Sequence, residues 1–246
     1  MLILLPPSET KRDGGTDGSS LSLAELSFPE LTRSRKTALA GLRSISKSVA
    51  ASTDALGLGP TQRFEINRNR TVTSSPTLPA IERYSGVLYD AIDVEHLGSH
   101  ARRFLGASVL IHSALFGLVG ADDPIPAYRF SHDSRIPGTS LAKLWRAENA
   151  AVLARQPGLV LDLRSESYVH LGPAGDRSVF LRVVSDDGTG HRRALNHFNK
   201  HGKGELVRAI ANAQADFDTV AELADWSRSA DINLVSGTDG GMELVV

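Results

Sequence analysis

Aliphatic residues cluster in three short runs along the chain. The first run is Met1–Leu5, which stops at Pro6, and the others are Val109–Ser113 and Leu159–Leu163. Proline cannot continue a β-ladder, and near-continuous aliphatic runs are typical of buried central strands in α/β sheets. The pattern therefore predicts three buried strands.

Apolar residues at helical spacing fill much of the chain between these runs. They predict helices over residues 28–48, from about residue 79, and over 141–154, 203–215 and 220–226. Two segments, 179–198 and 232–246, resemble β-hairpins that turn at Asp186-Asp187-Gly188 and at Asp239-Gly240-Gly241. Strands and helices are mixed throughout, without repeats or a clear linker, so we predict one mixed α/β domain over residues 1–246.

Polar residues follow each predicted strand: Ser8, Glu9, Thr10 and Lys11, then His112 and Ser113, then Arg164, Ser165 and Glu166. Ligands of α/β sheets bind outside the carboxyl ends of the strands, so parallel neighbours would form one pocket there. We expect Lys11 and Arg164 to bind an anion or a carbonyl group, and Glu9 and Glu166 to act as acid–base groups. Polar residues are also ordinary at exposed strand ends, and this alternative stays open.

The segment DALGLGP, residues 54–60, lies between two helical stretches. This arrangement fits a helix-hairpin-helix element, in which backbone amides, here at Gly57 and Gly59, hold a DNA phosphate. Glycine is equally common where a helix simply ends, so an ordinary turn between helices is the alternative.

Two further segments carry cations in a sequence context that is typical of a binding site. Tyr128 and Arg129 lie in a proline-rich loop over residues 120–138, where Arg129 is either functional or paired with Asp122 or Asp123. Lys200 and Lys203 come just before a predicted helix, which is a composition typical of anion binding. A solvated hairpin end would have the same composition.

Composition narrows the possible functions. The chain has no cysteine, which excludes thiol chemistry and thiolate metal sites, and its net charge of −1 provides no global signal for nucleic acid. The histidine pairs His96/His100 and His197/His201 lack the other residues of a metal motif, and no dinucleotide or phosphate loop is present. We expect a soluble, cytoplasmic protein with no metal, no cofactor and no membrane segment. The sequence does not indicate an oligomeric state.

Several blocks together resemble the YaaA family of peroxide stress resistance proteins across essentially the whole chain. The blocks are LLPPSETK, RYSGVLYDAI, SALFGLV, DDPIPAYR, LAKLWR, LVLDLRSESY, NHFNKHGKGELVRAI and INLVSGTDGGMELV. The resemblance implies a single-domain α/β fold with a helix-hairpin-helix element. It also implies a role in peroxide resistance and iron control, with DNA bound in a positively charged cleft.

The matching blocks also carry site residues. The resemblance implies roles for Ser8 and Lys11 in the opening motif, where one branch of the family has lysine in place of Glu9. The other matching positions are Tyr128, Arg129, Trp145, Arg164, Ser165, Tyr168, Lys200, Lys203 and Gly204, with DALGLGP at the place of the DNA-binding hairpin.

Two functions remain open from the sequence. The first is a protein that binds DNA non-specifically through a basic cleft under oxidative stress. The second is an enzyme that acts on a nucleobase, nucleoside or related small molecule, with Lys11, Glu9 and Glu166 as its catalytic groups.

Overall fold

The computed structural model describes residues 1–186, 192–194, 198–237 and 240–246, with only the backbone described at residues 192–194 and 198. The predicted hairpin turns at Asp187-Gly188 and at Asp239 lie outside the described residues, as does His197.

Within those residues, eight strands form one sheet in the order β4-β3-β1-β6-β7-β10-β9, with β8 paired to β7. Their bounds are β1 Leu2–Leu5, β3 Val109–Ser113, β4 Gly117–Gly120, β6 Val160–Asp162, β7 Ser178–Asp186, β8 Arg192–Ala194, β9 Leu234–Ser236 and β10 Met242–Val245. A separate antiparallel pair joins β2 (Thr77–Pro79) to β5 (Pro124–Pro126).

The three predicted aliphatic strands lie side by side as the centre of this sheet. β1 runs parallel to β3 on one side and to β6 on the other, with Ile3 opposite Val109 and Leu161. All residues of the three strands are buried. The chain thus visits one side of β1 first and the other side later, which creates a switch point at the carboxyl ends of β1 and β6.

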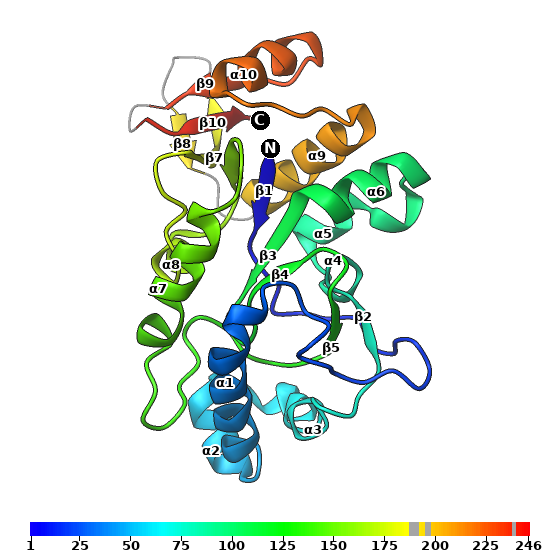
Figure 1. The fold of residues 1–246 in the computed structure, drawn as a ribbon, viewed down its shortest axis with the longest axis vertical. Coiled ribbons are helices and arrows are strands. Elements are labelled where there is room, and N and C mark those ends of the chain that lie inside the picture. Colours follow the sequence, from blue (N-terminus) through cyan, green and yellow to red (C-terminus); the bar gives the residue numbers. More distant parts are fainter. Residues whose placement is uncertain (187–191, 195–197, 238–239) are drawn as a thin grey trace.

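Ten helices surround the sheet in the described part of the chain. They are α1 Thr32–Ile45, α2 Val49–Leu56, α3 Phe64–Arg70, α4 Ala80–Arg83, α5 Val87–Ile92, α6 Ser99–Ser108, α7 Leu141–Ala154, α8 Glu166–His170, α9 Phe198–Ala213 and α10 Val220–Ser229. In Figure 1, α5, α6 and α9 lie on one side of β1 and α7 and α8 on the other, while α1, α2 and α3 gather at the far end of the molecule.

Most differences from the predicted elements have a local cause. The helix predicted from residue 79 is broken into α4 and α5, because Tyr84 is extended and Gly86 has a φ of 103° that other residues rarely adopt. The first helix begins with a 3-10 turn at Pro29–Leu31. Both predicted hairpins are confirmed as antiparallel pairs, β7 with β8 and β9 with β10.

A search of the described helices for a membrane-spanning segment finds none with sufficient length and apolar character.

Candidate functional site

A cavity of about 860 Å³ lies at the switch point, outside the carboxyl ends of β1 and β6 and beside β7. The first turns of α5 and α9 contribute to its wall. The structure brings together a large part of the residues expected at the strand ends and before the last long helix. Those that line the cavity are Ser8, Glu9, Arg164, Ser165, Glu166, Tyr168, Lys200 and Lys203.

Lys203 is the most unusual of these groups because its side chain is buried in the cavity wall. The residue is 5% exposed, and its ammonium donates to the carbonyl oxygen of Leu163 at 3.0 Å and lies 5.5 Å from the centre of the Phe180 ring. Burial lowers the pKa of Lys203 from 10.5 to about 8, Asp162 opposes the shift and Arg182 adds to it. Part of the Lys203 population is therefore a neutral amine just above neutral pH.

The position of Lys203 depends on the next residue, Gly204. A Cβ atom on Gly204 would collide with the carbonyl oxygen of Leu88 and with the Cβ of Ala91, both in α5. Glycine therefore lets α9 pack directly on α5, and this close approach places the first two turns of α9, with Lys203, at the cavity wall.

Arg164 borders the cavity, but its guanidinium is turned inward. It forms a bidentate salt bridge with the Asp162 carboxylate, with N···O distances of 2.9 Å and 2.7 Å. It also donates to His112 Nδ1 and to the Gly172 carbonyl oxygen, at 2.8 Å each. The residue is completely buried. With four of its five donors engaged in this way, Arg164 joins β6 to β3 and to the segment after α8.

Lys11 and Arg129 do not line the cavity but contact Glu9, which does, and the Lys11 ammonium donates to the Glu9 carbonyl oxygen at 3.2 Å. Arg129 forms a salt bridge of 2.7 Å with Glu9, which lines the cavity. The expected alternative, that Arg129 pairs with Asp122 or Asp123, is wrong. Asp122 pairs instead with Arg102, and Asp123 accepts hydrogen bonds from Ser27 and Gly120, because the loop folds back on α6 and on the segment before α1.

Tyr128 is completely buried beside these cations and does not reach the cavity. Its hydroxyl lies 2.6 Å from the hydroxyl of Tyr84 and 2.7 Å from that of Ser113. Tyr128 therefore ties the loop before Phe130 to the end of β3.

Of the remaining predicted residues of the cavity, Ser165, Glu166 and Lys200 are exposed and Ser8 is half-buried. Glu166 contacts Arg182 at 3.4 Å, Ser8 shares a hydrogen bond of 3.1 Å with Thr10, and Ser165 and Lys200 project from the first turns of α8 and α9. Their polar atoms are available at the cavity mouth.

Sequence reasoning missed the aromatic side chains of the cavity: Tyr89, Phe130, His132 and Phe180. Phe180 sits in the predicted hairpin, and Tyr89 sits in the predicted helix after residue 79. Each of these patterns is equally typical of an ordinary core. These side chains are recognised as cavity residues only because the folded chain brings them together around the strand ends.

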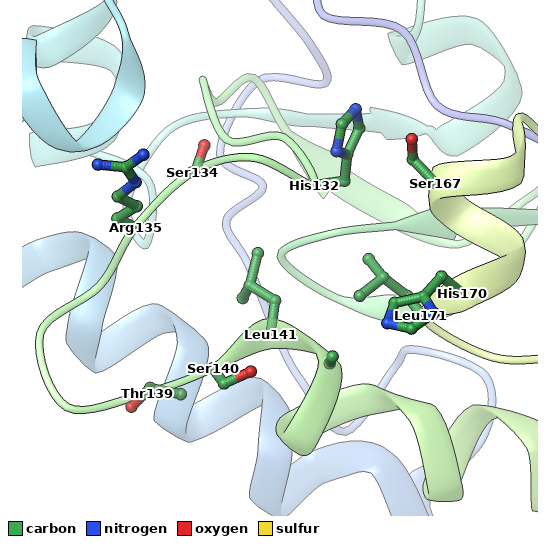
Figure 2. A pocket seen from close by; sticks show the side chains of 10 residues that line it. His132, Ser134, Arg135, Thr139, Ser140, Leu141, Ser167, His170 and Leu171 are labelled. Carbon is green, nitrogen blue, oxygen red and sulfur yellow. The ribbon is translucent and has the colours of Figure 1, made fainter.

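A second, smaller cavity of about 530 Å³ lies next to the first and shares His132 with it. Figure 2 shows His132 and Ser167 along its upper edge, Leu141 and Leu171 below them, and the Arg135 guanidinium turned away from His132. The side chain of Ser140 caps the start of α7 by accepting from the Lys143 amide.

The glycine turn between α2 and α3 lines neither cavity, although Arg135 of the second cavity donates from its backbone amide to the Ala55 carbonyl oxygen just before the turn, at 2.8 Å. Its amides already have acceptors within the chain: Gly57 donates to Asp54 at 3.4 Å, Leu58 to Thr53 at 3.0 Å and Gly59 to the Gln62 side chain at 3.0 Å. A phosphate at this turn would have to compete with these hydrogen bonds.

Comparison with known proteins gives the family. Residues 1–231 match the family model described as peroxide stress protein YaaA. A UPF0246 protein of Corynebacterium efficiens is 43% identical over 94% of this chain and 93% of its own length. A UPF0246 protein of Streptomyces coelicolor is 37% identical over 93% of this chain and 89% of its own length. An uncharacterized protein of Campylobacter jejuni is 25% identical over 87% of this chain and 86% of its own length. The resemblance found in the sequence blocks is thus confirmed, and the chain belongs to the YaaA family of peroxide stress proteins.

Proposed function

We propose that this YaaA-family protein binds a small planar ligand, of the nucleobase or nucleoside class, in the strand-end cavity. The observation that carries the proposal is the buried ammonium of Lys203 in the cavity wall, with one carbonyl acceptor at 3.0 Å and no carboxylate salt bridge in the described residues. An ammonium has three donors, so Lys203 keeps donors for a ligand.

The size and lining of the cavity favour this class of ligand. A volume of about 860 Å³ lies within the range of small-molecule sites, which is roughly 300–1,000 Å³. Four aromatic side chains line the cavity, namely those of Tyr89, Phe130, Tyr168 and Phe180, and the partly exposed ring of Phe180 offers flat apolar surface for a planar ring. Glu166 and Lys200 at the mouth supply acceptor and donor groups for the ring edges or a sugar.

If the bound molecule also reacts, the geometry favours Lys203 as the proton acceptor. A general base works best with a pKa near the operating pH, and the pKa of Lys203 is lowered to about 8. Glu9 is held by Arg129, and Lys11 does not line the cavity. We therefore assign the catalytic role to Lys203 before Lys11, Glu9 and Glu166.

The test is thermal stabilisation of the protein by a panel of nucleobases and nucleosides. At least one compound should raise the melting temperature of the wild type, and Lys203→Met should reduce that effect. Lys36→Met, which removes an exposed lysine of α1, is the matched control and should keep the effect. Failure of every compound to stabilise the wild type would contradict the proposal.

A second candidate function is non-specific DNA binding, and one surface feature favours it. Arg33, Lys36 and Arg43 are exposed on α1, and none of them has an ion pair among the described residues. Lys36 and Arg43 come three and ten positions after Arg33, so all three lie along one helix face. From there they could contact successive phosphates of a DNA backbone. This face is a better candidate than the amides of Gly57 and Gly59, which are already engaged.

Duplex binding measured over a range of salt concentrations tests this candidate. Neutralising Arg33, Lys36 and Arg43 with glutamine should weaken binding by about tenfold or more and flatten its salt dependence. Arg103→Gln, an exposed cation of α6, is the control. Binding that survives the α1 changes but is lost in Gly59→Asp would move the contact to the turn between α2 and α3.

A further inference from the structure

Two buried cations, Lys11 and Arg129, lie together behind the wall of the strand-end cavity. Lys11 is 5% exposed and Arg129 is 8% exposed. One carboxylate, that of Glu9, forms a salt bridge with Arg129, and the Glu9 side chain is 61% exposed and lines the cavity. Both cations are therefore buried, whereas the Glu9 carboxylate that pairs with Arg129 is largely exposed.

This pair of cations has more donors than acceptors. Arg129 Nε is buried and has no hydrogen-bond partner among the residues that the structure describes. Lys11 Nζ makes a single hydrogen bond in the described structure, of 3.2 Å, to the Glu9 carbonyl oxygen. Leaving such donors without acceptors inside a protein is costly, so a buried guanidinium nitrogen without an acceptor, beside an ammonium with one, indicates a missing acceptor group.

The surroundings hold both cations in place. The Lys11 ammonium lies 4.2 Å from the centre of the Tyr128 ring and 5.5 Å from that of Tyr84. The backbone of Arg129 is clamped by Asn69, whose amide group donates to its carbonyl and accepts from its N–H at 2.8 Å each. A binding group held this firmly needs little rearrangement when a ligand arrives.

We infer that Lys11 and Arg129 form an oxyanion subsite of the strand-end cavity, and that the Glu9 carboxylate occupies it until a phosphate or carboxylate of the ligand displaces it. The inference rests on the proposed function, since it gives the cavity ligand an anionic group. It extends the expected ligand class to include phosphorylated or carboxylated forms of a nucleobase or nucleoside.

The charges around Lys11 agree with this assignment. Burial lowers the pKa of Lys11 from 10.5 to about 7 and Arg129 lowers it too, whereas Glu65 and Glu9 oppose the shift. Arg68 also lowers the pKa of Lys11, but Arg68 itself forms salt bridges with Glu65 at 3.1 Å and with Asp13 at 2.6 Å. An anion bound beside Lys11 would favour the ammonium, so binding near neutral pH should take up a proton.

Calorimetric titration with sulfate, and separately with acetate, tests the subsite. Both are oxyanions that do not titrate near pH 7.5, and the two arms separate a phosphate-like from a carboxylate-like site. In the wild type, binding should be more endothermic in Tris than in HEPES, because the buffer supplies the proton that Lys11 takes up. Glu9→Gln should bind the preferred anion about tenfold more tightly, because the internal competitor loses its charge.

The control is Glu30→Gln, which removes a carboxylate from an exposed pair with Arg155 outside the cavity. Its anion affinity should match that of the wild type. Lys11→Met should abolish the buffer dependence. The inference is overturned if neither anion binds to Glu9→Gln, or if Glu9→Gln and Glu30→Gln bind the anion equally.

The result also separates this inference from the proposed function. If neutral nucleosides stabilise the protein but Glu9→Gln gains no anion affinity, the proposed ligand class is supported and the anion subsite is contradicted. If the anion binds as expected but no nucleobase or nucleoside stabilises the protein, the subsite stands and the nucleobase class fails.

Discussion

The backbone of Gly204 in α9 lies directly against the carbonyl oxygen of Leu88 in α5, with no room for a side chain between them. Gly204→Ala should therefore destabilise the protein by about 1–3 kcal/mol, although alanine is the better helix former. Urea unfolding measures this change. Gly59→Ala is the control, since a Cβ there meets only the Gln62 side chain at 3.6 Å, and equal stability of the two variants would contradict the packing.

Asp162 balances the buried guanidinium of Arg164, so its removal should be severe. Asp162→Asn leaves a fully buried charge without its carboxylate and should cost about 3–5 kcal/mol of unfolding free energy. Asp225→Asn removes one partner of an exposed pair with Arg228 and should cost less than about 1 kcal/mol. Similar losses in the two variants, measured by urea unfolding, would mean that Arg164 finds another partner or water.

Lys11 should make stability depend on pH in a defined window. Its folded pKa of about 7 lies below the unfolded value of 10.5, so the unfolded state binds more protons between these limits. Wild-type stability should gain from this group as pH rises from about 7 to 10.5, and the penalty is full below pH 7. The advantage of Lys11→Met over wild type should therefore be largest at pH 6 and shrink towards pH 10.

Urea unfolding of both proteins at pH 6, 8 and 10 measures this difference. Lys36→Met, at an exposed position, should show no such trend. A stability difference between Lys11→Met and wild type that stays constant across the three pH values would show that the pKa of Lys11 is ordinary.

Tyr128→Phe should separate a structural role from a binding role. It removes the hydroxyl between Tyr84 and Ser113 but keeps the ring beside Lys11, and should cost about 1–3 kcal/mol because the buried Tyr84 hydroxyl loses a partner. Anion and nucleoside affinities should stay close to those of the wild type. A large loss of affinity at unchanged stability, measured by calorimetry and urea unfolding, would place Tyr128 in the binding site instead.

The central strands could be predicted from the sequence because their signal is local. Leu2–Leu5, Val109–Ser113 and Val160–Asp162 are aliphatic runs with abrupt ends, and such runs have few alternatives to a buried strand. The break at Gly86 was missed because the residues on either side of it continue a helical pattern. Its cause is a positive φ, which the pattern of apolar residues does not reveal.

The candidate site was predictable only as a region. Strand ends and a glycine-rich helix start pointed to Ser8, Glu9, Glu166 and Lys203, all of which line one cavity. The aromatic side chains around them come from segments far apart in the chain. Their shared surface exists only once the sheet has formed.

The sequence by itself determined the family, the buried strands and the kinds of charged groups that follow them, since these depend on residues close together in the chain. Only the tertiary structure decided what each cation does. Arg164 meets Asp162 and His112 and holds their two strands together, whereas Lys203 meets one carbonyl among the described residues and lines the cavity. A cation's role is set by the acceptors that surround it, and those acceptors are brought to it by packing of distant segments.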